Sequence, residues 1–99
     1  MQRTDIERIF EAFFEKYKKT EGDRTVWSAY WTEHTGAGVL EINLTKCPRG
    51  TVFKVFVNNK KALEVIGWDA FFPAMETFAA EHPGLYDQDA FFSGMEAML

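Results

Sequence analysis

The segment VLEINLT, at residues 39–45, alternates apolar and polar side chains from Leu40 onward. Successive side chains of a β-strand point to opposite faces, so Leu40, Ile42 and Leu44 share one face and the polar residues share the other. This alternation predicts a strand that is buried on one side. The apolar face of such a sheet needs a second layer to cover it.

Three further segments with strand composition flank this one. Turn residues separate them: a Gly-containing stretch at 35–38, Pro48 and Gly50, and the pair Asn58-Asn59. Connections this short join antiparallel strands, because a parallel crossover needs a dozen residues or more. The sequence therefore predicts a four-stranded antiparallel meander, with strands at residues 25–33, 39–45, 51–57 and 62–66.

A helix is expected before the meander, from about residue 5 to about residue 20. Thr4 and Glu7 have the spacing of a capping box. The apolar residues that follow recur at intervals of three and four, which places them on one helical face. Gly22 is the expected stop.

A repeated phrase follows the meander. The octapeptide DAFFPAME at residues 69–76 returns as DAFFSGME at residues 89–96. Each copy predicts an amphipathic helix, with Asp69 as one N-cap and Asp89 or Asp87 as the other. Pro73 leaves the start of the first helix open, at Asp69 or nearer Phe72. Gly94 costs the second helix about 1 kcal/mol relative to Ala.

These elements predict one α+β domain over residues 1–99: an N-terminal helix, the meander, and two C-terminal helices packed on one sheet face in two layers. Trp27 and Trp31 share a strand face. The pattern leaves open whether that face is core or surface, and partial burial of Trp favours core.

Charge is unevenly distributed along the chain. Residues 25–61 carry five bases against two acids, a net of +3, whereas residues 62–99 carry seven acids and no base. A phosphate backbone needs clustered Lys and Arg, so no direct nucleic-acid binding is expected. No apolar run is long enough for a membrane helix, and the N-terminus lacks a signal-peptide pattern. The expected location is the cytoplasm.

Residues with reactive side chains are few and widely separated. Cys47 is the single cysteine and lies in a turn, and the two histidines, His34 and His82, lie far from it in sequence. Neither histidine has a metal-ligand partner at the i, i+4 spacing. The sequence predicts no catalytic residue, no metal site and no cofactor.

Interaction chemistry remains. The sequence predicts a small, acidic, non-enzymatic protein-binding module whose partner has a basic surface, in the manner of inhibitors of nucleic-acid-handling complexes such as anti-CRISPR or immunity proteins. The expected contacts are the acids and exposed aromatic residues of the C-terminal helices, together with the two tryptophans: Trp27, Trp31, Asp69, Phe71, Phe72, Glu76, Asp87, Asp89, Phe91 and Phe92.

Three alternatives remain open. The Phe pairs could lie on broad buried helix faces rather than on the surface. The chain could be a carrier or an enzyme with a Phe- and Met-lined cavity for a small apolar ligand between sheet and helices. A homodimer is possible, with the last helix completing its core.

Overall fold

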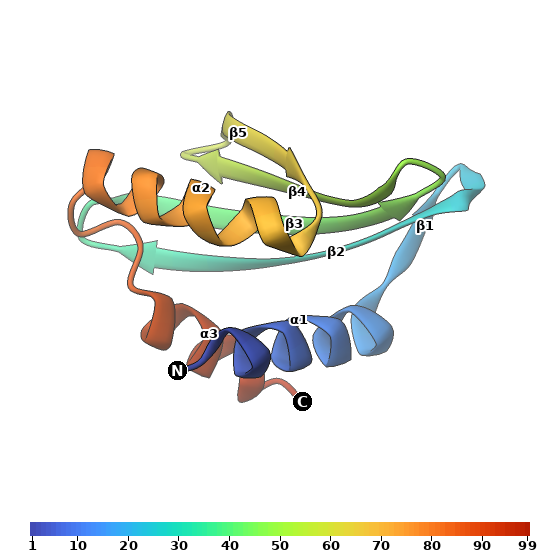
Figure 1. The fold of residues 1–99 in the computed structure, drawn as a ribbon, viewed down its shortest axis with the longest axis horizontal. Coiled ribbons are helices and arrows are strands. Elements are labelled where there is room, and N and C mark those ends of the chain that lie inside the picture. Colours follow the sequence, from blue (N-terminus) through green and yellow to red (C-terminus); the bar gives the residue numbers. More distant parts are fainter.

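A computed structural model gives the backbone of residues 1–99 and every side chain except those of Glu21 and Asp23. An N-terminal helix is followed by five strands and two helices (Figure 1). The elements are α1 (Arg3–Tyr17), β1 (Lys19–Glu21), β2 (Asp23–Thr35), β3 (Gly38–Cys47), β4 (Gly50–Val57), β5 (Lys60–Ile66), α2 (Trp68–Glu81) and α3 (Gln88–Glu96). The α+β class is confirmed.

The five strands form one antiparallel sheet in the order of the sequence, from β1 to β5. In the central strand β3, Leu40, Ile42 and Leu44 are fully buried, as the alternation predicts. The Asn58-Asn59 turn has positive φ at both residues, which suits the twist of a tight hairpin. Figure 1 shows the sheet as a long, curved surface with the helices on one side.

The number of strands was predicted wrongly, as four rather than five. The first helix ends at Tyr17, earlier than expected, and Lys18 already has an extended backbone with φ −60° and ψ 143°. The chain then pairs along β2 as the short strand β1 before turning at Gly22. Gly22 thus belongs to the β1–β2 turn and does not end the helix.

Helix starts also differ in detail from the sequence prediction. Thr4 lies inside α1, whose N-cap is Gln2, and the Asp5 carboxylate accepts a hydrogen bond from the Gln2 N–H at 2.9 Å. Asp69 lies in the first turn of α2 rather than at its cap, and Pro73 is inside that helix. Of the two candidates for the last helix, Asp87 is the N-cap.

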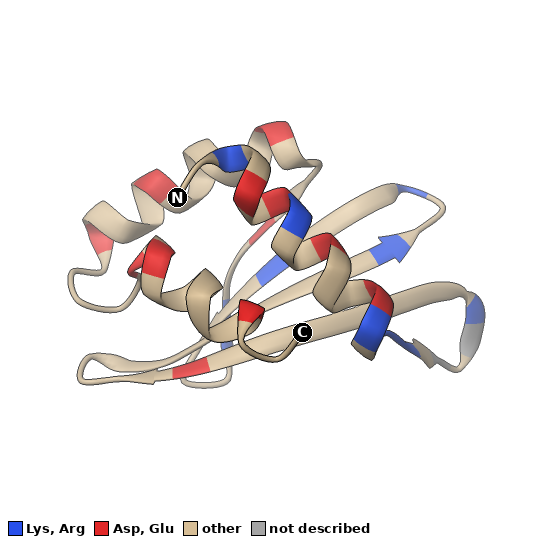
Figure 2. Cartoon of the chain, turned by 90° about the horizontal axis from the view of Figure 1, so that it is seen from below, with Lys and Arg blue, Asp and Glu red and all other residues tan. Residues whose placement is uncertain are grey.

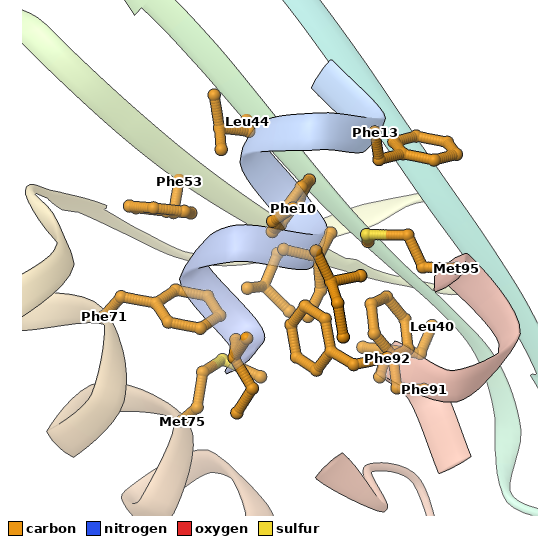
Figure 3. Close-up of a cluster of buried hydrophobic side chains, with 14 of the residues drawn as sticks. Phe10, Phe13, Leu40, Leu44, Phe53, Phe71, Met75, Phe91, Phe92 and Met95 are labelled. Atoms are coloured by element: carbon orange, nitrogen blue, oxygen red, sulfur yellow. The ribbon is translucent and has the colours of Figure 1, made fainter. Parts of the chain in front are cut away.

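All three helices contribute to one core against the inner face of the sheet. Figure 3 shows side chains from α1, α2, α3 and the strands pointing toward one another. Phe10 of α1 lies at the centre, with ring centroids 6.1 Å from Phe53 of β4 and 5.9 Å from Phe92 of α3. Aromatic pairs at this separation add stabilisation beyond the burial of their area.

Gly94 lets α3 lie close to β2. A Cβ atom at this position would overlap the Glu33 Oε1 atom and would touch the Trp31 ring at 3.5 Å. The glycine that weakens the helix intrinsically is therefore what allows close packing on the sheet.

Candidate functional site

Strand β2 is much longer than its neighbour β1. The three residues of β1 pair with Ser28, Trp27 and Asp23 of β2. From Ala29 to Thr35, β2 pairs with β3 on one side, and across the described backbone no strand lies on the other side. We call this open side of residues 29–35 the β2 edge.

The register shows which backbone groups face outward. Val39 of β3 bonds to Asn58 through both its N–H and its C=O, so its polar groups face β4. Backbone groups alternate in direction along an antiparallel strand, so the groups of Leu40 and Ile42 face β2. Their partners, Glu33 and Trp31, are thereby paired with β3.

The intervening residues of β2 must then face the other way. Tyr30, Thr32 and His34 direct their N–H and C=O groups toward the β2 edge, where no strand receives them in the described backbone. An exposed row of donors and acceptors is a template for another strand.

The two edges of the sheet differ in protection. Strand β5 carries Lys60 and Lys61, has a register shift in its pairing with β4, and lies beside α2. Lysines, bulges and covering helices are the usual devices that prevent strand addition. Residues 29–35 contain no Lys, Arg or Pro, and their register with β3 continues without a shift. Along residues 29–35 the β2 edge has no lysine, proline or register shift, although α1 packs beside β2 as α2 packs beside β5, and Glu33 is a charged residue on its inner face.

An apolar groove of about 410 Å³ lies beside the start of this edge. Its lining includes Phe13 and Tyr17 of α1, Trp31 of β2 and Met98. The Tyr17 hydroxyl donates a hydrogen bond to the Met98 carbonyl at 2.7 Å, and the Phe13 ring packs edge-on against Trp31 with centroids 5.8 Å apart. These contacts hold the walls of the groove in place.

The two ends of the β2 edge differ in charge. Lys19 lines the groove at the start of the edge, and Lys16 Nζ donates to the Met98 carbonyl at 3.0 Å. Glu33 and Asp87 line a second hollow at the far end. The edge therefore runs from a basic end to an acidic end.

The outer face of the sheet, opposite the helices, adjoins the edge at Tyr30. This residue is 60% exposed and lines hollows on both the edge and the outer face. Phe56 and Glu41 lie nearby on the same face. Burial raises the pKa of the Glu41 carboxyl above its usual range.

The sequence-predicted contact residues fall into two groups. Phe71, Phe72, Phe91 and Phe92 are buried in the core, so they are not exposed anchors in this structure and the alternative of broad buried helix faces describes them. The acids remain at the surface: Asp69, Glu76, Asp87 and Asp89 are exposed. Figure 2 shows acids along the helices and most bases on the strands and α1.

The two tryptophans lie on the inner face, as favoured by the sequence, because Trp31 pairs with the buried Ile42. Trp31 is half-buried and its Nε1 donates to Glu33 Oε1 at 2.8 Å. Trp27 lies near the end of the helical layer, is 38% exposed, and has the Lys18 ammonium 5.4 Å from its ring. Of the predicted contacts, the structure places Trp31 beside the start of the β2 edge, and Asp87 and the buried Phe91 beside its far end.

Sequence reasoning missed the edge residues Tyr30, Thr32 and His34. The available signal was a strand pattern without Lys or Pro. The sequence did not show that β1 is only three residues long and therefore leaves residues 29–35 of β2 without a neighbour on one side. Among the described side chains, no three His, Cys, Asp or Glu residues gather closely enough to hold a metal ion. Within the same described part, no helix is long and apolar enough to cross a membrane.

Comparison with known proteins adds no assignment: no family model, curated protein or solved structure matches this chain.

Proposed function

We propose that this chain is a small protein-binding domain that receives an extended strand of its partner along the β2 edge. The observation that carries the proposal is the row of outward-facing backbone groups at Tyr30, Thr32 and His34. Strand addition draws its affinity from main-chain hydrogen bonds and its specificity from pockets for alternate side chains.

The groove supports the same mode of binding. Side chains on one face of an added strand would lie over the partly exposed Tyr17 and Trp31 and the exposed Met98. Aromatic residues at a partly exposed position are frequent anchors of protein interfaces. The edge would form hydrogen bonds with the backbone of a partner strand, and the groove would contact its side chains.

The exposed acids support a partner with a basic surface. Asp69 and Glu76 project from α2, and residues 62–99 carry no compensating base. Complementary charge accelerates association more than it tightens the final complex. We therefore expect Asp69→Asn with Glu76→Gln to slow association at low salt, with little effect on dissociation.

The carrier hypothesis receives no comparable support. The space between sheet and helices holds fully buried side chains, including Phe10, Phe53 and Phe92. The grooves described above are at the surface and open to solvent.

The experiment compares three baits in native cells: the unmodified chain, Thr32→Pro and Glu64→Pro. Thr32→Pro removes an N–H that faces the β2 edge and leaves the pairs with β3 intact. Glu64→Pro is the matched control, because Leu63 and Val65 direct their backbone groups toward β4 and Glu64, between them, faces the opposite edge. A partner lost with Thr32→Pro and retained with Glu64→Pro supports the proposal. Equal capture by all three correctly folded baits refutes it.

A further inference from the structure

We infer that the strand received by the β2 edge is the β2 edge of a second copy of this chain, in an antiparallel pair related by a two-fold axis at Thr32. The inference rests on the proposed function, because it names an occupant of the same edge; the acids of α2, which packs beside β5 at the opposite edge of the sheet, take no part in this pairing.

The length of the edge suits self-pairing. The edge has seven residues, 29–35. It begins just after Ser28, which pairs with the first residue of β1, and it ends with β2 at Thr35. When two copies pair with Thr32 opposite Thr32, Tyr30 of each copy lies opposite His34 of the other. The residues brought together are then those whose backbone groups face outward.

This register satisfies every outward-facing group. Two residues that form a hydrogen-bonded antiparallel pair exchange both of their bonds. The three pairs, Thr32 with Thr32 and Tyr30 with His34 twice, would therefore form six bonds. A shift of two residues in either direction would leave one of the three residues without a strand partner, because β1 or the turn after Thr35 would take that place.

The side chains in this register are compatible. On the outer face the cross-strand pairs are Thr with Thr and Tyr with His, and both are favourable neighbours in sheets. On the inner face, Trp31 of one copy lies opposite Glu33 of the other, so the two Glu33 carboxylates are not directly opposed. The Trp31 indole already donates to Glu33 within one chain, which shows that the two groups are chemically matched.

The charges favour the antiparallel direction. One end of the edge has Lys16 and Lys19, and the other has Glu33 and Asp87. Antiparallel pairing places the basic end of one copy against the acidic end of the other, at both ends of the interface. At physiological salt the Debye length is about 8 Å, so these short contacts persist while the net repulsion of two chains of charge −4 is largely screened.

The first test is sedimentation at physiological salt over a range of concentrations. An edge of this length predicts a weak dimer, with a Kd on the order of 10–100 µM. The unmodified chain and Glu64→Pro should dimerise within this range, whereas Thr32→Pro should stay monomeric with an unchanged circular dichroism spectrum. Dimerisation of folded Thr32→Pro with unchanged affinity would overturn the inference.

The second test determines the register by cysteine crosslinking in a Cys47→Ser background. Thr32→Cys places two sulfur atoms across the two-fold axis, where hydrogen-bonded Cα atoms lie about 5.5 Å apart, within disulfide range. Tyr30→Cys is the matched control on the same edge and face. Its two copies would lie four residues apart along the strand, about 13 Å, and should not crosslink. Equal crosslinking of the two variants would contradict the register.

The two proposals fail differently. A chain that stays monomeric well above 100 µM overturns self-pairing, yet a partner captured by the unmodified chain and lost with Thr32→Pro would keep the proposed function. A chain that dimerises without using the edge, shown by dimeric Thr32→Pro, overturns self-pairing. If partner capture is then also unaffected by Thr32→Pro, the proposed function fails as well.

Discussion

Gly94→Ala should have opposite effects on stability in two backgrounds. In the native background, the new methyl group would overlap Glu33 Oε1, which accepts a hydrogen bond from Trp31 Nε1 at 2.8 Å. The Glu33 side chain can move aside, but only by giving up that bond. In a Glu33→Ala background there is no carboxylate to displace.

The magnitudes follow from two opposing contributions. Replacing Gly by Ala inside a helix stabilises it by about 1 kcal/mol. Losing a hydrogen bond to a charged group costs about 1.5–3 kcal/mol, and the lower value applies here because the pair is partly exposed. Gly94→Ala should therefore destabilise the native chain by about 0.5 kcal/mol. In the Glu33→Ala background it should stabilise by about 1 kcal/mol, which gives a coupling of about 1.5 kcal/mol.

The assay is a double-mutant cycle of urea denaturation at low micromolar concentration, where association does not contribute. Four proteins are compared: the native chain, each single variant and the double variant. Equal stabilisation by Gly94→Ala in both backgrounds would refute the argument that Gly94 makes room for the Trp31–Glu33 pair.

Three further predictions concern the core, a cap and a partly buried carboxylate. Phe92→Ala should destabilise the fold by about 3–5 kcal/mol in urea denaturation, because the side chain is fully buried. Asp87→Ala should cost about 1 kcal/mol in the same assay, because Asp87 Oδ1 accepts from the Ala90 N–H at 3.1 Å; no loss would remove its role as the cap. Glu41→Gln should raise the melting temperature at pH 7. Burial raises the pKa of Glu41 in the folded state, so its charged form opposes folding, and the gain should vanish as pH falls below the unfolded pKa of about 4.3.

Much of the fold could be predicted because its local patterns agree with its tertiary environment. The alternation at residues 39–45 matches a strand with one buried face, and Asn58-Asn59 matches a tight hairpin. Strand β1 could not be found in this way. It contains three residues, and only pairing with β2 defines it as a strand.

The candidate site was less accessible from the sequence. Phe71 and Phe92 read equally well as core or as interface, because burial depends on how much sheet surface three helices can cover. The β2 edge exists because β1 is much shorter than β2, and no local sequence motif indicates this difference in length. Trp31, Asp87 and Phe91 were the predicted contacts that the structure places beside this edge.

Residue-resolved hydrogen exchange of β2 follows the edge amides themselves, so it reports directly whether the β2 edge is open and whether it pairs. At high dilution, the amides of Tyr30, Thr32 and His34 should exchange fast, while those of Trp31 and Glu33, paired with β3, stay protected. The three edge amides should become protected together as the protein concentration rises through the dimer Kd. Edge amides that are as slow as their neighbours at high dilution, or that gain no protection at any concentration or with a captured partner, would contradict the account.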